Sequence, residues 1–257
     1  MIFSKRKKFF LVSVLLAWGF LVVLFTPFYY RYLSIAILAI LSYPLSAWSL
    51  YEDLDGVEWI LNLILPVLYL PALALFSFLL PGSIWLRALI FLVALLGQYG
   101  VLLSVNIFSV AVIRTIQLLR AAQAIGFLFT ILIAFFLFNT LFSFKPVSYL
   151  AALIAGLISF PLALQSLWAV RLDKKILKKL VFLSFCISFL LFELSMMISL
   201  WPVNILIASL FLVACLYIFL SLMQYRLNER LFAKTVFEYI RLAVLIFIVT
   251  FLAAHWG

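Results

Sequence analysis

Long apolar runs alternate with short polar breaks along almost the whole chain. A helix needs roughly 20 mostly apolar residues to cross about 30 Å of hydrocarbon, and nine runs close to that length can be marked in the 257 residues. They cover residues 9–26, 32–50, 58–80, 84–104, 123–143, 147–168, 180–200, 203–223 and 238–254. The pattern predicts an all-α, polytopic transmembrane helix bundle of about nine spans, forming a single membrane-embedded domain over residues 1–257.

The stretch 105–123, VNIFSVAVIRTIQLLRAAQ, interrupts this pattern between the fourth and fifth runs. On a helical wheel its polar residues gather in one half, as in a helix that lies in the membrane interface. We predict an amphipathic segment at the cytoplasmic surface, which would be either a connector on the membrane or a gating or docking helix. Its candidate interface residues are Asn106, Arg114, Gln117 and Arg120.

The distribution of lysine and arginine predicts the orientation, because cytoplasmic loops retain these residues. With the N-terminus inside, nine spans place 15 of the 18 cations on the inner side and 3, Arg31, Arg87 and Lys145, on the outer side. A ten-span alternative, in which 105–123 also crosses the membrane, would move the basic loop 171–179 outside, so we reject it. We expect a cytoplasmic N-terminus and an outer C-terminus in the cytoplasmic (inner) membrane.

Composition excludes an ordinary soluble globule. The chain is 69% apolar and 10% charged, whereas about a quarter of the residues of a soluble domain are charged. Its net charge of +10 would suggest nucleic acid only if one water-facing domain gathered the cations, and no run is long enough to form one. We assign the charge to orientation and to anionic lipid headgroups at the cytoplasmic face, and expect no nucleic-acid partner.

Catalytic signatures are absent from the sequence. His255 is the only histidine, and there is no G-x-S-x-G motif, P-loop or paired intramembrane aspartate, so metal sites of the H-E-x-x-H type and histidine-based triads cannot be assembled. Cys186 and Cys215 lie in apolar runs and are expected to pack there. We predict a non-enzymatic protein without catalytic residues, metal or cofactor, and a lipid-modifying enzyme is the least favoured alternative.

Glu193 is the one acidic residue deep inside a predicted span, about seven residues from its outer end. An ionisable group in hydrocarbon is expensive and is by default a functional candidate. Arg87 and Asn139 fall in the same outer half of the bundle. If their helices are neighbours, Arg87 would pair with Glu193 and Asn139 would complete a polar pocket; otherwise Glu193 fixes helix register.

Four carboxylates crowd the short break before the third span. They are Glu52, Asp53, Asp55 and Glu58, in the sequence YEDLDGVE. The cluster would dock a basic partner or a divalent cation, although it lacks the ligand spacing of a calcium loop. The simpler interpretation is a solvated turn with Gly56 at the bend.

Two local patterns predict the shape and packing of individual spans. Pro66 and Pro71 share the third run, so we expect it to be bent. The sixth run carries Ala151, Ala152, Ala155, Gly156 and Ser159, small residues that let two helices approach closely.

Three stretches together carry a resemblance: residues 49–81, residues 106–140 and the sequence FELSMMISLWPVN at 192–204, followed by the terminal Trp256 and Gly257. On these the chain resembles an uncharacterised multi-pass membrane protein family of candidate-phylum bacteria, nearly from end to end. The resemblance implies an integral membrane protein and brings no substrate, cofactor or functional residue with it.

Two functions remain open from the sequence. The first is a scaffold or assembly subunit that binds other membrane components through its bundle face and inner loops. The second is a small-solute or proton-coupled transporter or channel with an outward-facing polar site around Glu193.

Overall fold

The computed structural model describes residues 4–113 and 118–254, and within these ranges every regular element is a helix. The elements are α1 (Lys5–Phe25), the 3-10 turn η1 (Phe28–Tyr30), α2 (Arg31–Leu50), α3 (Glu58–Leu61), α4 (Ile64–Ser77), α5 (Ile84–Ile113), α6 (Leu119–Ser143), α7 (Ser148–Arg171), α8 (Lys178–Ser199), α9 (Ile205–Leu227) and α10 (Ala233–Leu252). In the described part of the chain nine helical segments, with α3 and α4 counted as one, are long and apolar enough to cross a membrane. The predicted all-α architecture with about nine spans is confirmed.

Contacts between residues divide the chain into two compact units. Unit 1 comprises Met1–Ile133 and Leu172–Lys175, and unit 2 comprises Ala134–Arg171 and Ile176–Gly257. Helix α6 is therefore shared, with its residues up to Ile133 in unit 1 and the rest in unit 2. The expectation of a single domain stays a prediction.

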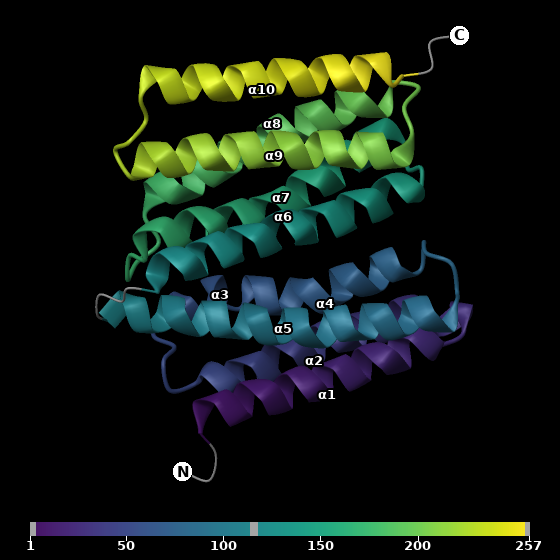
Figure 1. The fold of residues 1–257 in the computed structure, drawn as a ribbon, viewed down its shortest axis with the longest axis vertical. Helices are drawn as coiled ribbons and strands as arrows, with labels where there is room; N and C mark the ends of the chain where they lie inside the picture. Colours follow the sequence, from purple (N-terminus) through teal and green to yellow (C-terminus); the bar gives the residue numbers. More distant parts are fainter. Residues whose placement is uncertain (1–3, 114–117, 255–257) are drawn as a thin grey trace. The chain divides into compact units, whose positions relative to one another are not determined.

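Unit 1 is built around α4, which is surrounded by α1, α2 and α5 (Figure 1). Most residues of α4 are buried, among them Tyr69, Leu70 and Leu73. The Tyr69 hydroxyl donates to the carbonyl oxygen of Val93 on α5 at 2.8 Å. Gly97, one turn further along α5, faces the same ring so closely that a Cβ there would overlap the Tyr69 hydroxyl. A glycine thus lets a large aromatic side chain lie between two helices.

The third span, which its prolines predict to be bent, is divided into two helices. Helix α3 ends at Leu61 and α4 begins at Ile64. Pro66 has no N–H with which to reach the carbonyl of Asn62 four residues earlier, so the break falls where that hydrogen bond would be. Pro71 lies inside the continuous α4.

The described parts of the segment 105–123 belong to two long helices and form no separate interfacial helix. The first nine residues of the segment continue α5, which runs unbroken for 30 residues, or about 45 Å. Its last five residues begin α6 at Leu119. The apolar side of 105–113 packs into unit 1, with Val105 and Phe108 fully buried, so tertiary packing extends the span beyond the point where its polar residues begin.

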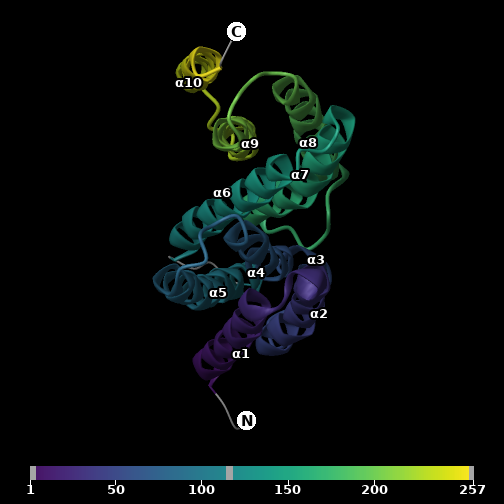
Figure 2. The same cartoon turned by 90° about the vertical axis from the view of Figure 1, so that its right-hand side faces the viewer.

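Unit 2 has its tightest packing between α7 and α8. The small-residue face of α7 is buried, and the Ser188 hydroxyl of α8 donates to the carbonyl oxygen of Gly156 at 2.7 Å. The predicted close-packing face is therefore confirmed. Helix α9 packs on both α7 and α8, whereas α10 lies beside α9 (Figure 2) and buries only Thr250.

Candidate functional sites

The acidic loop between α2 and α3 pairs with the N-terminal end of α1. The Lys5 ammonium donates to both carboxylate oxygens of Asp53, at 2.7 and 2.8 Å, and Lys8 donates to Glu52 at 2.7 Å. The hydrogen bond and charge of Lys8 hold the pKa of the Glu52 carboxyl below its ordinary value of 4.5. Two of the four predicted docking carboxylates are thus engaged by the chain's own lysines, and a basic partner would have to compete with them.

The other two carboxylates of the loop have different surroundings. Asp55 is exposed and precedes Gly56, whose positive φ of 50° makes the turn that was predicted there. Glu58 is only 3% exposed. In the described part of the chain, no group of three or more His, Cys, Asp or Glu side chains is arranged to hold a metal ion.

Glu58 belongs to a buried polar cluster between α3 and α5. The Asn62 amide nitrogen donates to the Ser109 hydroxyl at 2.8 Å and lies 3.4 Å from the Glu58 carboxylate. The Oδ1 atom of Asn62 is buried and has no partner among the described residues. This cluster was not predicted from the sequence, although the spacing of Glu58 and Asn62, four residues apart, would place both on one helical face.

A second buried amide that sequence reasoning missed is in unit 2. Gln165 on α7 is 1% exposed, and within the described ranges neither its nitrogen nor its oxygen has a hydrogen-bond partner. An unsatisfied buried amide is costly. Its only sequence signal is a glutamine in an otherwise apolar run.

The three residues of the predicted intramembrane site have separate environments. Glu193 lies on the exposed side of α8 and makes no hydrogen bond or ion pair with the described residues. Asn139 of α6 is buried and donates to the Ser209 hydroxyl of α9 at 3.0 Å, within unit 2. Arg87 belongs to unit 1. The pairing of Arg87 with Glu193 stays a prediction, because the two residues belong to different units.

The predicted interface residues of 105–123 are divided between two helices. Asn106 is half-buried on α5, and its Oδ1 atom is enclosed without a partner in the described structure. Arg120 is exposed in the first turn of α6. Arg114 and Gln117 lie outside the described residues.

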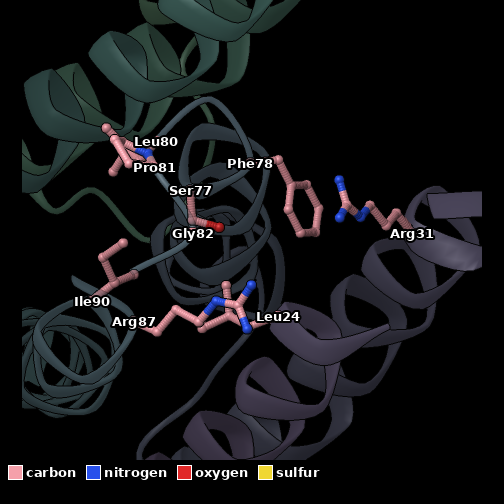
Figure 3. Close-up of a pocket in the computed structure, with 9 residues that line it drawn as sticks. All are labelled: Leu24, Arg31, Ser77, Phe78, Leu80, Pro81, Gly82, Arg87 and Ile90. Atoms are coloured by element: carbon pink, nitrogen blue, oxygen red, sulfur yellow. The ribbon is translucent and has the colours of Figure 1, made fainter. Parts of the chain in front are cut away.

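Arg87 instead lines a cavity in unit 1 together with Arg31 (Figure 3). The cavity has a volume of about 190 Å³ and lies where α1 and α4 end and α2 and α5 begin. Its lining is completed by Leu24, Ser77, Phe78, Leu80, Pro81, Gly82 and Ile90. The two guanidinium groups come from different helices and reach the same opening, which the sequence alone did not indicate.

Comparison with known proteins gives a family. The model of a family described as a protein of unknown function, DUF5656, matches residues 52–253. The chain belongs to the DUF5656 family. The DUF5656 match begins in the acidic loop and ends at residue 253, just after α10, so it includes Glu58, Arg87 and Glu193 and leaves α1, α2 and Arg31 outside. No curated protein and no solved structure matches this DUF5656 chain.

Proposed function

We propose that this DUF5656 protein is a non-enzymatic scaffold or assembly subunit of a bacterial inner membrane, and that it binds another membrane protein through the exposed side of α8. The observation that supports the proposal is the position of Glu193. A carboxylate on that surface is costly in hydrocarbon unless it is protonated or meets a polar or cationic partner.

The two sides of α8 differ in what they contact. One side packs on α7 and is buried, with Leu183, Ile187 and Leu191 among its residues. The other side exposes Phe182, Phe189 and Met196. Glu193 lies between Phe189 and Met196 at helical spacing, so it belongs to the exposed apolar stripe.

A carboxylate in this stripe is unfavourable against lipid. Glu193 is six residues from the end of α8 at Ser199, or about 9 Å along the axis. Insertion scales assign about 2.5 to 3.5 kcal/mol to a charged residue at the centre of a span. A partner helix that offers an amide or cationic donor would remove this cost, which favours a protein partner over lipid at this position.

The transporter alternative requires a polar route that includes Glu193. Asn139, one of the two partners predicted for it, already donates to Ser209. The scaffold function is therefore favoured. Solute flux that depends on Glu193 would instead indicate a transporter.

The test is site-specific photocrosslinking in native membranes. A photoreactive residue at Phe189, beside Glu193, should trap a defined membrane protein, and Glu193→Leu should abolish the adduct while Glu193→Gln retains part of it. The control is the same probe at Leu245 on α10, which is also exposed and should give lipid adducts.

Three results would contradict the proposal. Recovery of lipid alone at Phe189 would leave Glu193 without a protein partner. A crosslink within the same chain would show that another part of this protein, and not a partner, covers the exposed side of α8. Loss of solute flux in proteoliposomes on Glu193→Gln, with expression intact, would favour the transporter.

A further inference from the structure

The cavity lined by Arg31 and Arg87 is a concentration of positive charge without a carboxylate. Arg31 begins α2, and Arg87 lies in the first turn of α5. Neither guanidinium forms an ion pair with the described residues; the only hydrogen bond of either is from Arg31 Nε to the Thr26 carbonyl, at a long 3.5 Å. Both side chains are half-buried.

The carboxylates of unit 1 lie near the opposite ends of these helices. Glu52, Asp53 and Glu58 follow the C-terminal end of α2, and the 20 residues of α2 separate them from Arg31 by about 30 Å. That distance is far beyond the N···O separation of about 4 Å of an ion pair, so these carboxylates do not neutralise the cavity. The N-terminus of α5, which follows Pro81 and Gly82 of the lining, adds partial positive charge.

Aromatic rings hold the two guanidinium groups in place. Arg31 lies 4.6 Å from the centre of the Phe78 ring and 5.6 Å from that of Phe28, and Arg87 lies 5.0 Å from that of Phe25. Figure 3 shows the Arg31 guanidinium beside Phe78 and the Arg87 guanidinium beside Leu24. Side chains restrained in this way lose less entropy when they bind a ligand.

We propose that this cavity binds a phosphate group. Guanidinium groups offer paired N–H donors that match the oxygens of phosphate, and two of them here can compensate a dianion or a phosphodiester. The volume of about 190 Å³ is far above the roughly 10 to 15 Å³ that a single water requires. This site is independent of the scaffold function proposed for α8.

Two sources can supply the phosphate group that this cavity is proposed to bind: a lipid headgroup and free inorganic phosphate. Around the same helix ends Tyr29 and Trp85 are each 84% exposed, and tyrosine and tryptophan side chains gather at headgroup depth in membranes. A lipid phosphate is thus the source that the surroundings favour.

The experiment has one arm for each source. In a neutral maltoside detergent, inorganic phosphate is titrated at constant ionic strength against chloride and binding is followed by the shift in Tm. In parallel, native mass spectrometry measures retention of phosphatidylglycerol relative to a phosphate-free glycolipid. The variants are Arg31→Gln and Arg87→Gln, with Arg230→Gln as the control because Arg230 is exposed in the connection between α9 and α10, in unit 2.

We expect each cavity variant to weaken phosphate or phosphatidylglycerol binding at least about tenfold, since hydrogen bonds to charged groups are lost, and Arg230→Gln to leave it unchanged. Binding of phosphatidylglycerol alone identifies a headgroup site, and binding of inorganic phosphate identifies a site open to the free anion. If neither binds, or if the glutamine variants bind like the native protein, the proposal is wrong.

A second pair of variants covers the case in which the glutamine variants fail to fold. Arg31→Lys and Arg87→Lys keep the charge of the cavity but lose the paired donors of guanidinium. We expect these variants to accumulate normally and to bind phosphate more weakly than the native protein. Unchanged binding in both lysine variants would contradict recognition by the guanidinium groups.

Discussion

Asn62 joins two helices through one amide group. Its nitrogen donates to Ser109 on α5 while its own segment continues toward α4. Glu193 is also a polar residue within a span. In contrast to Asn62, its side chain is exposed at the surface of its helix. The sequence marks both residues as polar groups in apolar runs, and only the packing of their helices distinguishes an internal link from an exposed carboxylate.

We expect Ser109→Ala to reduce stability by about 0.6 kcal/mol, the average for hydrogen bonds between membrane helices, and by no more than about 1.7 kcal/mol. The substitution removes the acceptor of the Asn62 amide. Ser104→Ala is a matched control on the same helix, because the Ser104 hydroxyl is buried and bonds only to the Gly100 carbonyl of α5. Unfolding by SDS titration measures both variants, and equal losses would contradict a contribution from the link between helices.

Gly97→Ala should reduce stability by about 1 to 3 kcal/mol, as overpacking does. The new methyl group would displace the Tyr69 ring and break its hydrogen bond to Val93. Gly100→Ala is the control on the same helix, because its Cβ would lie 3.5 Å from the Phe129 ring, an ordinary contact. SDS unfolding should separate the two variants; similar stabilities would show that Tyr69 moves aside freely.

At the scale of elements, α1 and the acidic loop are joined by charge. Lys5 and Lys8 meet Asp53 and Glu52, which are 48 and 44 positions away along the chain. Exposed ion pairs contribute little to stability, so the main effect of this contact is to fix the N-terminal end of α1 next to the loop. The contact requires the N-terminal end of α1 and the loop between α2 and α3 to lie on the same side of the membrane, as the nine-span topology predicts.

The contact between α1 and the loop should depend on acid pH. Because the pKa of Glu52 is lowered from 4.5, its pairing with Lys8 is present above that value and is lost as the pH falls through the lowered pKa. Spin labels at Ser4 and Asp55, with Cys186 and Cys215 replaced, should give one narrow distance at pH 7 and a broad distribution once the pH has fallen below the lowered pKa of Glu52.

The control for this measurement is Lys5→Gln with Lys8→Gln. It should give the broad distribution already at pH 7, without a further acid transition. A native distance distribution that does not change with pH would show that the ion pairs do not hold α1 against the loop.

At the scale of the whole molecule, the orientation of the spans is open to a direct test. Cysteines at Lys175 and Ser83, both in exposed connections between helices, are placed in a background without Cys186 and Cys215. An impermeant thiol reagent should label them from opposite sides of the membrane, because the charge distribution predicts that the loop 171–179 is inside. Labelling of both positions from the same side would refute the nine-span topology.

The number and type of the spans follow from the sequence alone. Backbone groups in hydrocarbon must be satisfied within the segment, so each long apolar run has to be a helix, and the run lengths set the count. The bend expected at Pro66 likewise requires no knowledge of its neighbours, because the missing N–H is a local property. The close packing of α7 is local in the same sense, since small side chains permit a close approach.

The assignment of polar residues to sites required the tertiary structure. The segment 105–123 has the periodicity of an interfacial helix, yet its first part continues α5 because Val105 and Phe108 are buried in unit 1. Arg31 and Arg87 are separated by 55 intervening residues along the chain and share a cavity only because α2 and α5 begin at the same end of unit 1. Apolar periodicity specifies which residues avoid water, whereas the choice of neighbouring helix depends on the fit between side chains, which no single segment contains.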